Sequence, residues 1–540
     1  MKLVRGGRLA QPLAAGARAE KYPRESPDHT RYSSPFPRRS SGGPVPAEIA
    51  EQRRVEAADV GTQNRILIFI AALASVFITA IESTIVATAM PTIVAALGGF
   101  DLLGWVFTSY LLTQVVTIPI YGRLSDLYGR KPILLIGVGF FILGSILCGF
   151  AWSMLSLVVF RVLQGLGAGA LVPVGRTVIG DVFHGEERAR LQGIISSVFV
   201  AAALIGPMVG AFIATHWIWP MIFWINVPIA MIAGAILIWC FRERIEKRRH
   251  CIDWGGAVLI CVGTATLMFA LAQASMLGPV LALALGAAGL VILAIFVVYE
   301  RSVAEPIWPM SLWSDRVASS GNIVSLALGA TTMGIAAYLP VYIQGVMGNS
   351  ATISGFVIMT MSASGPIGAL TAGRFMLRVS YRGTASAGAA IYIVGSIMMS
   401  LLDAQSSVYW AMASGLLMGL GIGMNNNTYL VAVQSESAWN QRGIATSALM
   451  FSRILGQAMG AAAFGGVLNA SLSPFLRSGE DLATKIMTPA GRAALPPDSA
   501  TAIIAGFDHA LHVIFIILVA LSLFVITVGL MLPKGRGIRK

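Results

Sequence analysis

Glu82 and Arg161 are charged side chains whose positions in this chain could let them bind and release a proton. Each lies well inside an apolar stretch long enough to cross a membrane, Glu82 in residues 66–90 and Arg161 in residues 154–175. At about 1.5 Å per helical residue, Glu82 lies roughly 13 Å from Pro91, and Arg161 lies at a similar depth. An ionised side chain costs at least a few kcal/mol there, so such residues usually mark an ion or proton pathway.

A buried carboxyl group next to a cation can bind and release a proton, because burial favours its neutral form and the cation favours its charged form. Glu82 is the only acidic side chain well inside the first six expected helices. We therefore predict that it interacts with Arg161, directly or through water. Two alternatives stay open: Glu82 could belong to a purely structural ion pair, and backbone carbonyls could satisfy Arg161.

Other polar side chains in apolar stretches could line a substrate path. Three consecutive asparagines occupy 425–427. Their amides are not expected to face lipid, so they could contact a substrate or join helices. A second cation inside a span could be structural or could contact an anion. His509 and His512 are expected to be interfacial residues rather than proton relays. The candidate cavity residues are Gln164, Tyr338, Asn425, Asn426 and Arg453.

Composition identifies the class of protein that holds these residues. Of 540 residues, 56% are hydrophobic and 12% are charged, and the mean hydropathy is +0.76. A soluble domain could not cover so much apolar surface, so we expect a polytopic membrane protein. The net charge of +13 is scattered over short loops and the four cysteines lack metal-ligand spacing. We therefore expect no nucleic acid, no metal and no disulfide.

Fourteen windows of about 20 apolar residues predict an all-α fold of transmembrane helices. The loops after even-numbered windows carry Lys and Arg, whereas the turns after odd-numbered windows up to the eleventh carry none. By the positive-inside rule, both termini are predicted to be cytoplasmic. The windows lie near 66–90, 102–121, 132–151, 154–175, 191–213, 219–241, 254–274, 279–299, 319–343, 354–376, 384–402, 408–431, 443–469 and 509–532.

The expected organisation is six, two and six helices between two tails. Residues 1–64 are basic, rich in Pro, Ser and Gly, and expected to be a disordered cytoplasmic tail. The remaining segments are a six-helix bundle at 65–241, two inserted helices with cytoplasmic linkers at 242–316, a second six-helix bundle at 317–533 with an external loop at 470–508, and a cytoplasmic tail at 534–540. We expect a functional monomer.

Four segments carry recognisable patterns. They are GRLSDLYGRKP at 122–132, RVLQGLGAGA at 161–170, AAALIGPMVGA at 201–211 and IESTIVATAMP at 81–91. Together with IFWINVPIA at 222–230, they make the chain resemble the major facilitator superfamily, specifically its fourteen-helix drug:proton antiporter family 2. The resemblance covers about residues 65–535.

This resemblance implies a major facilitator fold that exchanges substrate for protons by alternating access. Glu82 and Arg161 would couple proton movement to transport. The loop residues Gly122, Asp126, Gly129, Arg130 and Lys131 would form a cytoplasmic latch that stabilises the outward-facing state. Gly206, Pro207 and Gly210 would favour antiport, although Ala202 and Ala211 stand where this motif usually has glycine.

The function predicted from these features is proton-coupled efflux of lipophilic or cationic small molecules, that is, multidrug efflux. No GxxxxGK[ST] loop occurs, so we expect no ATP motor and no cofactor other than the proton gradient. The expected partners are the substrate, protons and membrane lipids, and the expected location is a bacterial cytoplasmic membrane. A dedicated exporter of a lipid, siderophore or metabolite and a proton-coupled uptake symporter stay open as alternatives. An enzyme is not expected.

Overall fold

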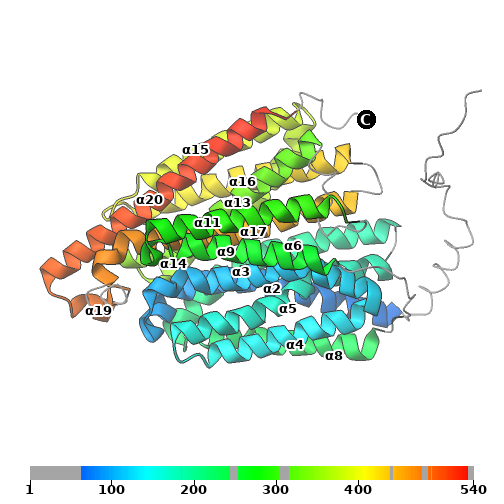
Figure 1. Cartoon of the computed structure of the whole chain (residues 1–540), viewed down its shortest axis with the longest axis horizontal. Coiled ribbons are helices and arrows are strands. Elements are labelled where there is room, and N and C mark those ends of the chain that lie inside the picture. Colours follow the sequence, from blue (N-terminus) through cyan, green and yellow to red (C-terminus); the bar gives the residue numbers. More distant parts are fainter. Residues whose placement is uncertain are drawn as a thin grey trace, which may run out of the picture. The chain divides into compact units, whose positions relative to one another are not determined.

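The computed structural model describes residues 62–183, 185–241, 243, 253–303, 315–437, 442–476, 485–487 and 489–532, which all lie in one unit of residues 59–540. Figure 1 shows that helices lying side by side build this part of the chain. The tail expected at 1–64, apart from its last residues, and the tail expected at 534–540 lie outside the described residues.

A helix occupies each of the fourteen expected ranges, and the sixth range holds two consecutive helices. The long helices are α2 (Thr62–Leu97), α3 (Leu103–Tyr128), α4 (Arg130–Gly149), α5 (Met154–Val182), α6 (Gly185–His216), α8 (Asn226–Cys240), α9 (Trp254–Ala272), α11 (Pro279–Glu300), α13 (Arg316–Val341), α14 (Ala351–Met376), α15 (Tyr381–Ser400), α16 (Val408–Glu436), α17 (Arg442–Leu476) and α20 (Pro497–Leu530). Short elements are η1 (Phe100–Leu102), α7 (Met221–Trp224), α10 (Ala274–Leu277), the π-helical η2 (Tyr342–Val346) and α19 (Pro489–Ala493).

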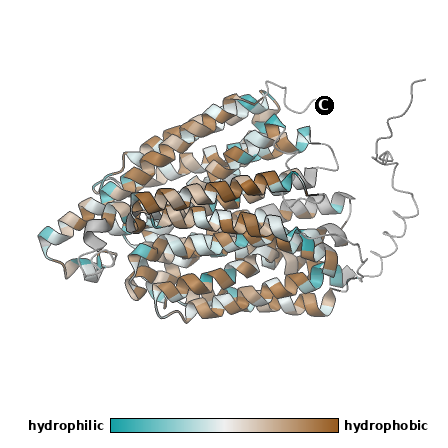
Figure 2. Ribbon diagram, viewed as in Figure 1, coloured by the Kyte–Doolittle hydropathy of each residue, from teal (hydrophilic) through white to brown (hydrophobic). Residues whose placement is uncertain are grey.

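Within the described residues, 11 helices are long and apolar enough to cross a membrane, by length and composition. Figure 2 shows brown, hydrophobic residues along the helices and teal, hydrophilic ones mainly near their ends. α6, α16 and α17 are not among these 11; α6 contributes only a shorter apolar helix, Val200–His216. The all-helical membrane fold is therefore confirmed, whereas fourteen crossings and cytoplasmic termini stay predictions.

The helices pack in two groups, which we call the first group (α2–α8) and the second group (α13–α20). α2 packs on α6 and α8, and α5 packs on α3 and α4. In the second group, α16 packs on α14 and α15, while α13 packs on α17. α9 and α11 pack on each other, and only 11% of the most apolar window of α11 is buried, as suits a lipid-facing helix. The division into bundles stays a prediction.

Glycines let several of these helices approach closely. A Cβ atom on Gly167 of α5 would overlap the backbone nitrogen of Phe141 in α4, and one on Gly423 of α16 would overlap the carbonyl oxygen of Gly365 in α14. Small residues are typical of such contacts in membranes, where helices associate mainly through close packing.

Several contacts between the two groups lie at one end, which we call the outer end because the loop charges predict that it faces outside. A Cβ atom on Gly104 of α3 would lie 3.1 Å from the Cα of Gly465 in α17. Asn469 Nδ2 donates to the Asp101 carbonyl oxygen over 2.7 Å. Phe100 of η1 packs on Phe507 of α20, with ring centroids 5.1 Å apart. The outer end is therefore closed.

Candidate functional site

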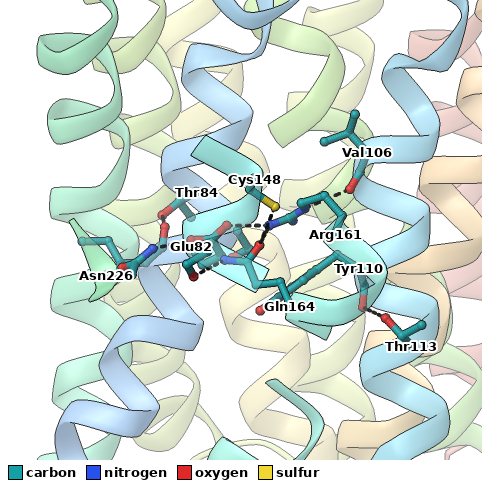
Figure 3. Close-up of polar contacts among 12 residues, drawn as sticks. Glu82, Thr84, Val106, Tyr110, Thr113, Cys148, Arg161, Gln164 and Asn226 are labelled. Atoms are coloured by element: carbon teal, nitrogen blue, oxygen red, sulfur yellow. Dashed lines mark hydrogen bonds and ion pairs between the residues drawn. The ribbon is translucent and has the colours of Figure 1, made fainter. Parts of the chain in front are cut away.

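The structure brings Glu82 and Arg161 together between α2 and α5 (Figure 3). Arg161 Nη1 donates to Glu82 Oε1 over 2.5 Å, and the side chains of Arg161 and Glu82 are 1% and 0% exposed, respectively. The predicted direct interaction is thus present. Its role in proton coupling stays a prediction.

Three further groups complete the coordination of this pair. Asn226 Nδ2, at the first residue of α8, donates to the second carboxylate oxygen of Glu82. Arg161 donates from Nη1 to Gln164 Oε1 over 2.6 Å and from Nε to the Val106 carbonyl oxygen over 3.1 Å. The open alternative in which carbonyls satisfy Arg161 is therefore realised only in part, alongside the ion pair.

Aromatic rings enclose the guanidinium group of Arg161. Its Cζ atom lies 4.1 Å from the centroid of the Tyr110 ring and 5.9 Å from that of Phe223. A cation over an aromatic face is attracted by the ring quadrupole, and the attraction grows when water is excluded. Tyr110 therefore adds to the stabilisation of Arg161 without supplying a hydrogen bond.

The network can hold or release one proton with little exposure to water. As an ion pair, Glu82 and Arg161 have no net charge, which lowers the cost of burial. Protonation of Glu82 removes the negative charge that Arg161 and Asn226 bind, so the pair and its tie to α8 weaken. A proton at this position would therefore weaken contacts among α2, α5 and α8.

The segment predicted as the latch loop is mostly helical: residues 122–128 end α3, Gly129 alone separates the two helices, and Arg130 and Lys131 begin α4. The backbone nitrogens of Arg130 and Lys131 donate to the Glu243 carboxylate over 2.7 and 2.9 Å. Lys131 Nζ donates to the carbonyl oxygens of Ile238 and Phe241, both over 2.7 Å. This segment is thus tied to the end of α8.

Glu243 acts as a cap for α4 that comes from another part of the chain. Gly129 precedes α4 with φ of 96°, a conformation that favours glycine, and leaves the first amide groups of the helix pointing at Glu243. A negative charge at a helix N-terminus is favourable. The side chain of Asp126 lies outside the described residues, and the latch itself stays a prediction.

The predicted antiporter motif lies where α6 packs on α2 and α14. Cβ atoms on Gly206 and Gly210 would overlap or crowd Thr84 Oγ1 and the Ile85 carbonyl oxygen, respectively. The carbonyl oxygen of Pro207 lies against Gly355 of α14. The motif therefore places α6 directly against the helix that carries Glu82.

The candidate cavity residues are dispersed. Gln164 belongs to the Arg161 network, and its Nε2 donates to Ser145 Oγ over 2.9 Å. Tyr338 Oη donates to the Ala461 carbonyl oxygen over 2.9 Å, in the contact of α13 with α17. Asn425 is buried and donates to Gly421 of its own helix.

The side chains of two candidates make no hydrogen bond or ion pair in the described part of the chain. Asn426 and Arg453 are both partly exposed and make no such contact there. Their position agrees with a role in substrate contact but does not test it, so the cavity assignment stays a prediction.

The sequence did not predict three residues that contact these two sites in the structure. Asn226 lies inside the IFWINVPIA segment, where a single amide in an apolar run was the available signal. Tyr110 lies at a depth similar to that of Arg161, but aromatic residues are too common in such helices to be singled out. Glu243 was one acid within a basic stretch, and only the packing of α8 on α4 shows what it binds.

Ionisable side chains inside membrane-spanning helices usually mark functional sites, such as paths for ions or protons. Residues 72–461 match the Major Facilitator Superfamily. The chain belongs to this superfamily, whose members are transporters, and the resemblance predicted from the motifs is confirmed.

Curated relatives extend this result. The chain is 33% identical to Multidrug resistance protein 3 of Bacillus subtilis over 403 residues, which cover 74% of this chain and 79% of the relative. It is 32% identical to Multidrug transporter protein MdtP of the same organism over 430 residues, 78% of each chain.

A solved structure supports the fold. A bacterial homolog of the human lysosomal transporter Spinster, in an inward-facing and unoccupied conformation, superposes with a TM-score of 0.63 at 14% identity. The match covers 87% of this chain and 98% of that one.

Proposed function

We propose that this protein is a proton-coupled antiporter that exports lipophilic or cationic small molecules by alternating access. The observation that carries the proposal is the Glu82–Arg161 ion pair, which is buried inside the membrane-spanning part. The pair joins α2 to α5, and Asn226 of α8 donates a hydrogen bond to Glu82. Relatives described as multidrug transporters support export of such substrates.

In the proposed cycle, a proton from outside neutralises Glu82 and weakens its contacts with Arg161 and Asn226. Helices α2, α5 and α8 then move relative to one another, and substrate competes for the released Arg161 environment. An inward proton yields about 2.3 kcal/mol per 100 mV of membrane potential and about 1.4 kcal/mol per pH unit. No nucleotide is needed as an energy source.

The proposal includes the finer features that the sequence predicts. The fourteen helices each cross the membrane, both termini are cytoplasmic, and the protein works as a monomer in a bacterial cytoplasmic membrane. The two glycines of the antiporter motif hold α6 against α2, so movement of α2 on protonation is passed to α6 and α14.

The first test is ethidium extrusion from energised cells that lack their own efflux pumps. We expect the wild-type protein to extrude ethidium and a protonophore to stop it. Glu82→Gln, which keeps the hydrogen-bonding shape but cannot lose or gain this proton, is expected to abolish extrusion at matched expression. Ser83→Ala, on the neighbouring residue, is the matched control and should extrude normally.

The outcomes separate the remaining alternatives. Absence of extrusion by correctly folded wild-type protein would remove the broad multidrug function and leave a dedicated exporter. Proton-driven accumulation instead of extrusion would identify an uptake symporter. Undiminished extrusion by Glu82→Gln would show that proton coupling runs elsewhere.

A further inference from the structure

The turn between α14 and α15 carries three arginine side chains that bind no other described part of the chain. Arg374 and Arg378 are exposed, and Arg382 is half-buried. Their side chains make no hydrogen bond or ion pair within the described residues. Glu436 ends α16 near this turn, since α16 runs alongside α14 in the same direction, but it forms no ion pair with them. The three positive charges are therefore available to a partner.

This turn lies at the end of the second group that is opposite to the outer end. η2, which precedes α14, belongs to the outer end because Tyr342 Oη donates to Asp508, the neighbour of Phe507. α14 has 26 residues, and such a helix is about 39 Å long. Its last turn therefore lies at the end that the loop charges predict to be cytoplasmic.

The same turn repeats the pattern of the latch segment in the first group. GRLSDLYGRK at 122–131 and GRFMLRVSYR at 373–382 both begin with Gly-Arg and end on a basic residue. Each segment joins a helix of 26 residues to a helix of 20 residues, α3 to α4 and α14 to α15. Lys131 and Arg382 are therefore at corresponding positions, each the second residue of the later helix.

In the first group, the chain itself binds the polar groups of this segment. Lys131 Nζ donates to two carbonyl oxygens at the end of α8. Arg130 Nη1 donates to Ser125 Oγ over 2.8 Å. The carboxylate of Glu243, which follows α8, accepts from the backbone at the start of α4. An acidic side chain of the protein thus lies beside these cations.

The second group has no counterpart of Glu243 in its sequence. α20 packs on α15 as α8 packs on α4, so the residues after α20 correspond in sequence to those after α8. Residues 533–540 contain four basic residues and no Asp or Glu. Ser380 Oγ accepts from the Gly383 nitrogen over 3.1 Å and so caps α15 without adding charge. The anion for Arg374, Arg378 and Arg382 therefore has to come from outside the chain.

Exposed apolar side chains lead up to the arginines along α14. Ile367, Leu370 and Arg374 have the spacing that places residues on one face of a helix. Leu370 and Leu377, on either side of Arg374 in the sequence, are both 66% exposed. In a membrane, such an apolar face contacts acyl chains, and arginine side chains at its end extend to the level of the lipid headgroups.

We propose that Arg374, Arg378 and Arg382 bind the headgroup of an anionic phospholipid. The phosphate oxygens accept paired hydrogen bonds from the guanidinium groups, and the acyl chains lie along the exposed face of α14. Attraction to anionic lipid amounts to about fivefold in affinity for each basic residue near the membrane surface. This site adds a specific lipid partner and does not depend on the proposed transport cycle.

The test measures lipid binding at the turn itself. A fluorophore is attached at Val379→Cys in full-length protein whose native cysteines are replaced, in bilayers of phosphatidylcholine. Nitroxide-labelled phosphatidylglycerol, which is anionic, and nitroxide-labelled phosphatidylcholine, which has no net charge, are compared as quenchers. Tyr128→Cys, at the corresponding position of the first group, carries the reference fluorophore. Val379 and Tyr128 are 45% and 60% exposed.

At Val379→Cys, we expect phosphatidylglycerol to quench at a concentration about a hundredfold lower than phosphatidylcholine, as three charges imply. Replacing Arg374, Arg378 and Arg382 together with Gln should remove this preference, and each single replacement should reduce it about fivefold. At Tyr128→Cys, the preference should be much smaller and should not change in these variants. The single replacements keep the proposal testable if the triple variant does not fold.

Arg316→Gln is the matched control for general attraction by a positively charged end. Arg316 is an exposed arginine at the start of α13, at the same end of the second group, and its side chain makes no contact of this kind within the described residues. Its replacement should leave the preference at Val379→Cys unchanged. A loss as large as that in Arg378→Gln would show attraction without a site and would overturn the proposal.

Three further outcomes would also overturn it. The two lipids could quench equally at Val379→Cys, or the triple variant could keep the preference for phosphatidylglycerol. Glycerol 1-phosphate could also displace labelled phosphatidylglycerol at an equal concentration, which would identify a site for a soluble anion rather than for a lipid. The measurement uses neither substrate nor a proton gradient, so its result is independent of whether Glu82→Gln abolishes extrusion.

Discussion

At the scale of single residues, Glu82 and Arg161 form a fully buried ion pair with no net charge. Arg161 is held by a carboxylate, an amide oxygen, a backbone carbonyl and an aromatic ring. Removing one partner from a buried ion pair typically costs about 3–5 kcal/mol because it leaves an uncompensated charge. In the proposed cycle, this cost is what would let protonation of Glu82 move the surrounding helices.

The contribution of Tyr110 can be separated into ring and hydroxyl. Tyr110 Oη has no hydrogen-bond partner among the described residues, so Tyr110→Phe should transport at close to the wild-type rate. Tyr110→Leu removes the ring over Arg161 and should weaken this site by about 2 kcal/mol, the size of a desolvated cation–π contact. Initial rates of ethidium extrusion at matched expression compare the two variants. Equal loss in both would show that the hydroxyl, not the ring, is needed.

At the scale of helices, close contacts fix how movements are passed on. α6 touches α2 through glycines on one side and α14 on the other, so it links the helix of Glu82 to the second group. Such contacts are discrete, because packed helices resist gradual deformation. The antiporter motif therefore has a packing role that its sequence resemblance does not describe.

This packing role predicts an energetic coupling between Gly206 and Thr84. Gly206→Ala would overlap Thr84 Oγ1 and should lower stability by about 1–3 kcal/mol. Thr84→Ala removes that oxygen, so the double variant should be more stable than the sum of the single changes predicts. Gly122→Ala, with nothing within 4 Å of the added atom, is the control and should be neutral or stabilising. Thermal unfolding of purified protein measures all four; strictly additive effects would contradict direct contact.

At the scale of the whole molecule, the structure is in a state with a closed outer end. The closure uses backbone contact between α3 and α17, an amide hydrogen bond and a pair of aromatic rings. None of these three contacts is an ion pair, so breaking them exposes no unpaired charge. A transporter that alternates between states needs contacts of this reversible kind.

A larger side chain at the closest contact should prevent closure. Gly104→Leu would place carbon atoms against Gly465, Ala461 and Tyr338, where the first added atom already lies 3.1–3.2 Å from its neighbours. We expect the variant to fold and to lose transport. Spin labels at Trp217→Cys, after α6, and Tyr409→Cys, at the start of α16, should lie farther apart in this variant than in the parent protein. Gly139→Leu on α4, with nothing within 4 Å, is the control. Normal transport by Gly104→Leu would mean that this contact need not form during the cycle.

The sequence by itself determined the class of protein and the positions of its helices. Apolar runs of membrane-spanning length must become helices because every backbone polar group in lipid has to be satisfied within its own segment. Glu82 and Arg161 could also be found, and their pairing predicted, because isolated charges at similar depths in lipid have few other partners.

Only the tertiary structure decided which neutral groups complete each site. Asn226, Tyr110 and Glu243 are ordinary residues until helix packing brings them to a charge or a helix end. His512 shows this most clearly, since the sequence favoured an interfacial residue and the fold places a carbonyl oxygen at each of its ring nitrogens. Hydropathy records how deep a residue lies, whereas the direction of a side chain and its hydrogen-bond partners depend on contacts between segments far apart in the chain.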